Sequence, residues 1–252
     1  MSTQGELRAL PVTGLPEVAD GAALGQLIAA QASELRDGDI VVVSQKVVSK
    51  AEGRIRDPRS VAAGADACRL ATDLGKDPAL VELILSESRA VLRAENGILI
   101  TETHHGFVCA NAGVDSSNLP EPGSVALLPK DPDASARRIR QEIQSVTGVA
   151  VGVIVSDSFG RAWRLGQTET AIGCAGVAPL DDWRGRRDAG GLELTATQIA
   201  IADEAAAAAD LVRDKASRVP VAIVRGLDRF VTPEDGPGAG TLRRDRDEDL
   251  FR

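Results

Sequence analysis

The segment 153–170 constrains the fold of this chain more than any other part of the sequence. It opens with an apolar, β-branched run of the kind that forms a buried strand, and this run stops at Asp157 and Ser158. A glycine and two arginines, Arg161 and Arg164, follow closely. Because open sheets usually bind ligands at the carboxyl ends of their strands, this order predicts a strand that ends in a polar site.

The side chains after the apolar run indicate what that site binds. Ser156, Asp157 and Ser158 offer the hard oxygen ligands that Mg²⁺ and Mn²⁺ prefer. Arg161 and Arg164 carry planar guanidinium groups, which pair with phosphate or carboxylate oxygens. We therefore expect a divalent metal and a phosphate at this site.

The length and cysteine content bound the class of protein. With 252 residues, the chain has room for one large domain or two small ones. It has no apolar run near the roughly 20 residues that span a bilayer, and its N-terminus lacks a secretion signal. Three widely spaced cysteines, Cys68, Cys109 and Cys174, fit neither a disulfide framework nor a zinc site. We expect a cytoplasmic protein without membrane contact.

Charge and aromatic content argue against general nucleic-acid binding. The formal net charge is −8, aromatic residues make up only 2% of the chain, and tyrosine is absent. The basic surface and the stacking platforms that nucleic acids require are therefore missing. A single phosphate-bearing ligand stays compatible with this composition, because a local cluster of cations and a metal can bind it.

Periodicity predicts a mixture of helices and strands. Helical spacing or capping patterns are present at residues 22–36, 60–74, 78–88 and 133–148, the last capped by Asp133, and a capping box at Thr195 and Gln198 opens an alanine-rich helix to about residue 215. Short apolar runs predict strands at residues 40–44, 98–101, 107–110, 125–128, 149–156 and 220–225. Since these elements do not alternate regularly, we expect an α+β fold.

A second polar loop, at residues 111–118, complements the first site. Asp115 and Asn118 lie three positions apart and would share one face of a helical turn. Alone, the loop is typical of an Asx-rich turn with a structural role. Together with Asp157 and Ser158 it predicts one or two divalent ions on a triphosphate, with Asn118 contacting the nucleotide.

The segment 44–53 supplies candidate phosphate ligands. It follows a predicted strand and contains Lys46 and Lys50, two of only five lysines in the chain. Lysine ammonium groups commonly bind phosphates. The alternative is a solvent-facing edge strand that lysines protect from aggregation. No G-x-x-x-x-G-K-[ST] motif occurs, which argues against a P-loop NTPase.

Four segments together, at residues 14–17, 43–53, 105–118 and 156–167, resemble the coenzyme F-420-0:L-glutamate ligase family, and the resemblance extends over residues 10–235. It implies a ligase that uses GTP and a divalent metal to add L-glutamate to the phospholactyl carboxylate of coenzyme F-420-0, and then further γ-linked glutamates. The route would pass through an acyl phosphate, with GDP and phosphate as products.

The resemblance also implies roles for individual residues. Positions that match the family's GTP contacts are Leu15, Pro16, Glu17, Val18, Gln45, Lys50 and Asn118. Asp115 and Asp157 match the ligands of one metal, Mg²⁺ or Mn²⁺, and Ser158 matches a ligand of a second. A monovalent cation is a further candidate cofactor. For Arg161 and Arg164 our hypothesis is that they hold acidic substrate groups or the γ-phosphoryl group, because they lie close to Asp157 in the sequence.

The family fold implied is an intertwined α+β homodimer. Residues 1–236 would form the ligase domain, and residues 237–252, which follow a glycine-rich stretch, would be a flexible charged tail or a linker. Some actinobacterial relatives carry a nitroreductase-like domain after such a linker. Two other functions use the same residue types: a metal-dependent phosphohydrolase, and a regulator that binds a nucleotide without turnover.

Overall fold

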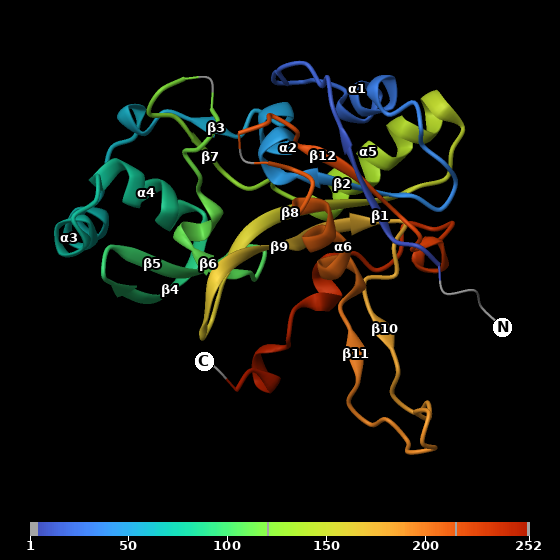
Figure 1. Cartoon of the computed structure of the whole chain (residues 1–252). Helices are drawn as coiled ribbons and strands as arrows, with labels where there is room; N and C mark the ends of the chain where they lie inside the picture. The colour runs from blue at the N-terminus through green and yellow to red at the C-terminus, as the bar shows by residue number, and fades with distance from the viewer. Residues whose placement is uncertain (1–4, 120, 215, 251–252) are drawn as a thin grey trace.

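The structure, a computed structural model, describes residues 5–119, 121–214 and 216–250, and its main element is a five-stranded sheet (Figure 1). In order across the sheet, the strands are β1 (Arg8–Val12), β12 (Val221–Arg225), β2 (Ile40–Ser44), β8 (Gly152–Arg161) and β9 (Arg164–Ala175). Strands β2 and β8 are parallel, and the other neighbours are antiparallel. Helices α1 (Leu24–Gln31) and α5 (Pro132–Thr147) cover one face, and α6 (Ile201–Asp210) covers the other.

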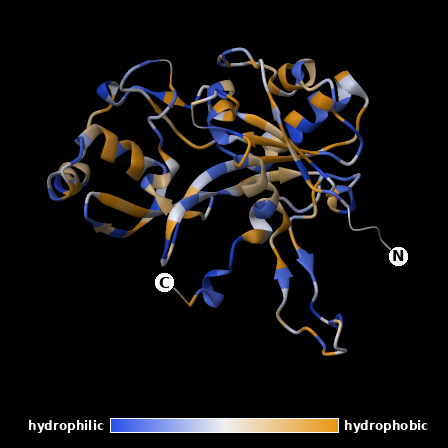
Figure 2. Ribbon diagram, in the orientation of Figure 1, coloured by the Kyte–Doolittle hydropathy of each residue, from blue (hydrophilic) through white to orange (hydrophobic). Residues whose placement is uncertain are grey.

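The middle strands are apolar along their whole length because both faces of the sheet are covered. Residues 40–43 of β2 are fully buried, and so are residues 153–155 of β8. Alternate side chains of β2 enter different clusters: Val41 packs with α1 and α5, and Val42 packs with α6. Figure 2 shows these hydrophobic segments gathered in the sheet and in the helices beside it. A strand that is buried on both faces therefore lacks the alternation of polar and apolar residues that a half-exposed strand shows.

A smaller lobe packs beside the main sheet. It contains helices α3 (Ala65–Leu74) and α4 (Pro78–Ser86) and a three-stranded antiparallel sheet of β4 (Ser88–Glu95), β5 (Ile98–Thr103) and β6 (Val108–Ala110). Helix α2 (Gln45–Ala51) and the paired strands β3 (Ile55–Arg56) and β7 (Val125–Ala126) join the two parts. Strands β10 (Asp181–Asp182) and β11 (Gln198–Ile199) form an arm that projects from the main sheet (Figure 1).

Mixed helices and sheets confirm the expected α+β class, and most predicted elements are present. The periodic segments became α1, α3, α4 and α5, and the predicted strands became β2, β5, β6, β7, β8 and β12. Strands β1, β3, β4, β9, β10 and β11 were not predicted; in β9 the outer half is polar and exposed. The intertwined homodimer stays a prediction. No helix in the described part of the chain is long and apolar enough to cross a membrane.

The strand at residues 149–156 does not end at Asp157, so that expectation was wrong. Strand β8 runs from Gly152 to Arg161 and turns into β9, with Asp157 opposite Thr170 in the middle of a long hairpin. The strand that ends next to Asp157 is β2, whose last residue, Ser44, pairs with Ser156. The polar site therefore lies beyond the end of β2 while β8 continues past it.

One alternative and two further local expectations were wrong. Residues 45–51 form helix α2 rather than an edge strand, with Gln45, Val48 and Ser49 buried. Asp131, not Asp133, caps α5: its side chain accepts from the Ala134 amide at 2.9 Å, because Pro132 takes the first helical position.

The third correction concerns the alanine-rich helix. Gln198 pairs with Asp182 in the β10–β11 arm, so it cannot complete a capping box with Thr195. Helix α6 therefore starts at Ile201 and ends at Asp210.

The glycine-rich stretch after residue 234 leads into a packed segment. Ala239 is fully buried, and its amide donates to Asp133 Oδ1 at 2.8 Å. A short 3₁₀ helix, Ala239–Leu242, follows, and then another at Arg246–Glu248. The division into a ligase domain at residues 1–236 and a tail at residues 237–252 stays a prediction.

Candidate functional site

A cavity of about 670 Å³ opens where β2 ends and α2 begins. Every residue that the family resemblance assigned to GTP or metal lines it: Leu15, Pro16, Glu17, Val18, Gln45, Lys50, Asp115, Asn118, Asp157 and Ser158. These residues come from four separate stretches of the chain. The parallel pairing of β2 with β8 is what brings two of those stretches together, because it sets Ser44 beside Ser156.

Lys46 lies between the acidic residues of the cavity. Its Nζ is 2.8 Å from Asp115 Oδ2 and donates to Ser117 Oγ at 2.6 Å. The Ser117 amide donates to Asp115 Oδ1 at 2.7 Å, so both carboxylate oxygens have partners. Burial alone would raise the pKa of Asp115, but the hydrogen bonds from Lys46 and Ser117 together hold it below its ordinary value. Asp115 is therefore an anion that a cation already neutralises.

Asp157 lies in a different electrostatic environment. Burial raises its pKa to about 7, the negative charges of Glu169 and Asp115 add to the rise, and Lys46 opposes it. Two neighbouring carboxylates thus act on Asp157, and Lys46, the ion-pair partner of Asp115, partly offsets their effect. This cluster of negative charges favours the binding of a cation.

A buried ion pair closes the floor of the cavity on the α6 side. Glu169 Oε2 on β9 accepts from Ser156 Oγ at 2.6 Å and lies 3.0 Å from Arg213 Nη2, while Glu169 Oε1 accepts from the Ser158 hydroxyl. The side chains of Glu169 and Arg213 are only 7% and 5% exposed. This network holds the Ser158 hydroxyl in place. Sequence reasoning missed Glu169 because it missed the hairpin, whose register sets Glu169 opposite Ser158.

The mouth of the cavity carries donors for an anionic ligand. Lys50 Nζ pairs with Glu17 Oε1 at 2.5 Å. Gln45 is 1% exposed; its Oε1 accepts from Ser49 at 2.9 Å, while its Nε2 has no partner among the described residues. A buried amide left without a partner costs free energy, so it calls for an acceptor that a ligand can supply.

Two residues of the rim have left-handed backbone. Asn118 and Arg218 both line the cavity, with φ of 56° and 57°. Residues other than glycine adopt this conformation at a cost, and such strain gathers at binding sites. Asn118 tolerates it better than most residues, because its short amide can bond locally.

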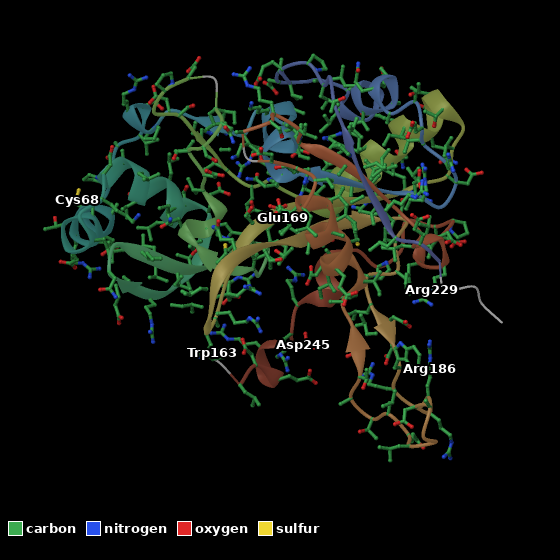
Figure 3. All side chains as sticks on the ribbon, in the orientation of Figure 1. Cys68, Trp163, Glu169, Arg186, Arg229 and Asp245 are labelled. Carbon is green, nitrogen blue, oxygen red and sulfur yellow. The ribbon has the colours of Figure 1, made fainter. Side chains whose placement is uncertain are left out.

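Arg161 and Arg164 lie outside this cavity. Both are exposed at the turn of the β8–β9 hairpin, where Arg161 Nη2 donates to the Leu165 carbonyl at 2.8 Å. Figure 3 labels Trp163 at the end of that hairpin, away from Glu169. Within one chain, Lys46, Lys50, Arg213 and Arg218 supply the cations of the cavity instead. The substrate role of the two hairpin arginines stays a hypothesis.

The carboxylates fit a divalent metal only in part. Among the described residues, no three His, Cys, Asp or Glu side chains are arranged to hold a metal ion by themselves. The pair Asp115 and Asp157, with Lys46 between them as a stand-in cation, nevertheless offers the oxygen ligands that Mg²⁺ and Mn²⁺ prefer. A metal here would take its remaining ligands from phosphate oxygens and water, as Mg²⁺ commonly does.

Comparison with known proteins gives a consistent match. The family model described as F420-0:Gamma-glutamyl ligase matches residues 14–226. The coenzyme F420:L-glutamate ligase of Methanothermobacter thermautotrophicus is 43% identical over 96% of this chain and 97% of its own length. The enzyme of the same name from Methanocaldococcus jannaschii is 44% identical over 91% of this chain and 90% of its own. That of Methanopyrus kandleri is 43% identical over 98% of both.

Proposed function

This chain belongs to the F420-0:gamma-glutamyl ligase family, and we propose that it uses GTP to join L-glutamate to the carboxylate of coenzyme F420-0. Formation of an amide bond in coenzyme F420 biosynthesis follows from the family itself. The observation that supports the finer proposal is that one cavity of about 670 Å³ is lined by all the residues that the family resemblance assigned to GTP and metal.

The nucleotide would bind across the mouth of the cavity. Lys50 and Lys46 offer ammonium groups to the phosphates, and the free Nε2 of Gln45 offers a buried donor. Glu17 and Asp115 hold these lysines in the absence of phosphate, at 2.5 and 2.8 Å. Phosphate oxygens would therefore replace the carboxylates of Glu17 and Asp115 as the partners of these lysines.

Asp115, Asp157 and Ser158 would hold the divalent cations. A bound metal would neutralise the triphosphate and the charge that develops during phosphoryl transfer. Glu169 accepts from the Ser158 hydroxyl and thereby fixes its direction. Arg213 lies 3.0 Å from Glu169 and supplies the counter-charge for this buried carboxylate.

Chemistry accounts for the need for a nucleotide. A carboxylate is a poor acylating agent, so the γ-phosphoryl group of GTP would move to a carboxylate oxygen and leave GDP. The neutral amine of L-glutamate would then attack the acyl carbon and lose one proton to solvent, the bond from that carbon to the phosphate oxygen would break, and phosphate would leave. The protein would contribute mainly positioning and charge stabilisation.

One reaction separates this proposal from its rivals. Protein, Mg²⁺ or Mn²⁺, GTP, L-glutamate and coenzyme F420-0 are mixed, and the products are followed by mass spectrometry and nucleotide chromatography. We expect a product heavier by one glutamyl residue. GDP should form only when both L-glutamate and coenzyme F420-0 are present. Phosphate release without L-glutamate would indicate a phosphohydrolase instead, and nucleotide binding without any turnover would indicate a regulator.

A further inference from the structure

Arg213 is a cation of the cavity to which neither the sequence patterns nor the family resemblance gave a role. It lies three residues after the end of α6 and lines the cavity together with Ser158 and Glu169. Its side chain is only 5% exposed, and that of Glu169, its ion-pair partner, is 7% exposed. A buried ion pair is a weak source of stability, because apolar side chains of similar volume often serve a fold as well. A buried pair that lines a ligand cavity therefore favours a role in the site.

The two oxygens of Glu169 have different partners. Oε2 accepts from Ser156 Oγ at 2.6 Å and lies 3.0 Å from Arg213 Nη2, which also donates to Ser156 Oγ at 3.2 Å. These three contacts close a triangle that holds Oε2 in one place. The other oxygen, Oε1, faces Ser158, which lies opposite Glu169 in the register of β8 and β9 and donates its hydroxyl proton to it.

The direction of the Ser158 hydroxyl matters for a cation. A serine hydroxyl has one proton and two lone pairs, and only the lone pairs can bind a metal. Because Ser158 donates its proton to Glu169 Oε1, the lone pairs of its oxygen point away from that acid. A hydrogen bond from a metal ligand to a neighbouring acceptor orients the ligand and raises its affinity for the metal. Glu169 thus prepares Ser158 as a cation ligand.

The pair of Glu169 and Arg213 acts through direction rather than through charge. Its members have opposite charges 3.0 Å apart, so together they add little net attraction for a cation. Arg213 also joins the pair to the rim of the cavity, because its Nη1 donates to the carbonyl of Pro220, a lining residue, at 3.4 Å. The guanidinium is therefore held by contacts with β8, with β9 and with the residue that precedes β12.

We propose that Arg213 is a positioning residue, which fixes Glu169 so that the Ser158 hydroxyl is directed towards the second divalent cation. The inference rests on the proposed function, in which Ser158 holds that cation. It adds the residue that determines how tightly the cation binds, although neither Arg213 nor Glu169 has to contact the metal or the phosphates.

The test compares two double variants that each remove one buried ion pair. Arg213→Met/Glu169→Gln keeps the side-chain volumes and leaves no unpaired charge, whereas Arg213→Met alone would leave a buried anion. The matched control is Arg54→Met/Glu87→Gln. The ion pair of Arg54 and Glu87 has a distance of 2.6 Å and side chains 9% and 16% exposed, and neither residue lines the cavity.

The measured quantity is the Kd of each bound Mn²⁺. Electron paramagnetic resonance follows free Mn²⁺ during its titration into protein with one equivalent of GTP, without L-glutamate or coenzyme F420-0. Ser158→Ala identifies the cation that Ser158 holds, because this variant should raise the Kd of that cation. We expect the Arg213→Met/Glu169→Gln variant to raise the same Kd by about tenfold, and the control to leave it unchanged.

A double-mutant cycle separates positioning from a structural role. If Arg213 and Glu169 act through the Ser158 hydroxyl, their replacement should cause little further rise of the Kd in protein that already carries Ser158→Ala. Glu169→Asp is a milder second variant, for use if the double variant does not fold. It keeps the charge, withdraws the carboxylate from Ser158 by one methylene and should raise the same Kd.

Several results would overturn the inference while the ligase proposal stands. These are an unchanged Kd in the Arg213→Met/Glu169→Gln and Glu169→Asp variants, an equal rise in the control, an equal rise with and without the Ser158 hydroxyl, no effect of Ser158→Ala, and a single Mn²⁺ per wild-type chain. If the wild-type protein formed no glutamylated product from GTP, L-glutamate and coenzyme F420-0, the ligase proposal would fail, and the inference would fail with it.

Discussion

Lys46 is the residue whose surroundings say most about how the site is prepared for its ligands. Its ammonium lies 2.8 Å from Asp115 and also acts on the charge of Asp157, so one cation serves two acids that are expected to share a metal. The hydrogen bond from Lys46 lowers the pKa of Asp115, and the charge of Lys46 opposes the rise in the pKa of Asp157. Any metal that binds Asp115 has to compete with it.

Lys46→Met keeps the length of the side chain and removes its charge. Because no cation then has to be displaced, we expect Mn²⁺ without nucleotide to bind more tightly, by a factor on the order of ten, while GTP binds more weakly. Isothermal titration with Mn²⁺ alone, and then with GTP, measures both. Asp157→Asn is the matched comparison and should weaken Mn²⁺ binding, since a neutral amide is a poor metal ligand. Mn²⁺ affinity that stays the same or falls in Lys46→Met would contradict this role.

At the scale of elements, the start of α5 joins three parts of the molecule. Asp131 caps the helix, which leaves the Asp133 side chain free to accept from Cys174 on β9 and from Ala239 in the C-terminal segment. The same carboxylate therefore connects the helix, the main sheet and the C-terminal segment. Gly238 is necessary here, because a Cβ would lie 2.5 Å from Asp133 Oδ2.

Asp133→Ala tests this connection. It leaves two backbone amides without an acceptor while the helix cap stays intact, so we expect the free energy of unfolding to fall by about 2–5 kcal/mol. Asp133→Asn keeps one acceptor oxygen and should lose clearly less. Urea unfolding monitored by circular dichroism compares the two variants with the wild type. Equal losses in both would show that the oxygen does not act as this acceptor.

At the scale of the whole molecule, two hairpins project from the main sheet with apolar side chains exposed. Trp163 and Leu165 at the turn of β8–β9 are 82% and 97% exposed, and Leu192 on the β10–β11 arm is 70% exposed. Exposed apolar residues on projecting elements are typical of an interface. They support the predicted intertwined homodimer, in which Arg161 and Arg164 could reach a site from a partner.

Light scattering tests that prediction. The chain has a mass of 26.3 kDa, and we expect the protein in solution to have twice this value. Leu165→Asp places a charge at the hairpin turn and should shift the mass towards that of the single chain, while Leu211→Asp, on an equally exposed leucine after α6, should not. A wild-type mass equal to that of the single chain would exclude the homodimer.

The residues of the candidate site were largely predictable from the sequence. Asp115, Asn118, Asp157 and Ser158 stand in compact polar stretches beside apolar runs, and the resemblance to a family extended that set to residues 15–18, 45 and 50. Local patterns also located most helices and the central strands, because burial on one or two faces leaves a periodic record in the chain. No periodic pattern in the sequence predicted strand β9, because its outer half is exposed and polar.

The sequence by itself determined the kinds of atoms at the site: carboxylates and hydroxyls for a cation, and lysines for phosphates. Only the tertiary structure decided which of them meet. The parallel pairing of β2 with β8 set Lys46 beside Asp115, and the register of the β8–β9 hairpin set Glu169 under Ser158 and carried Arg161 and Arg164 away. These are contacts between residues distant in the chain, and strand register, which no local pattern records, determines them.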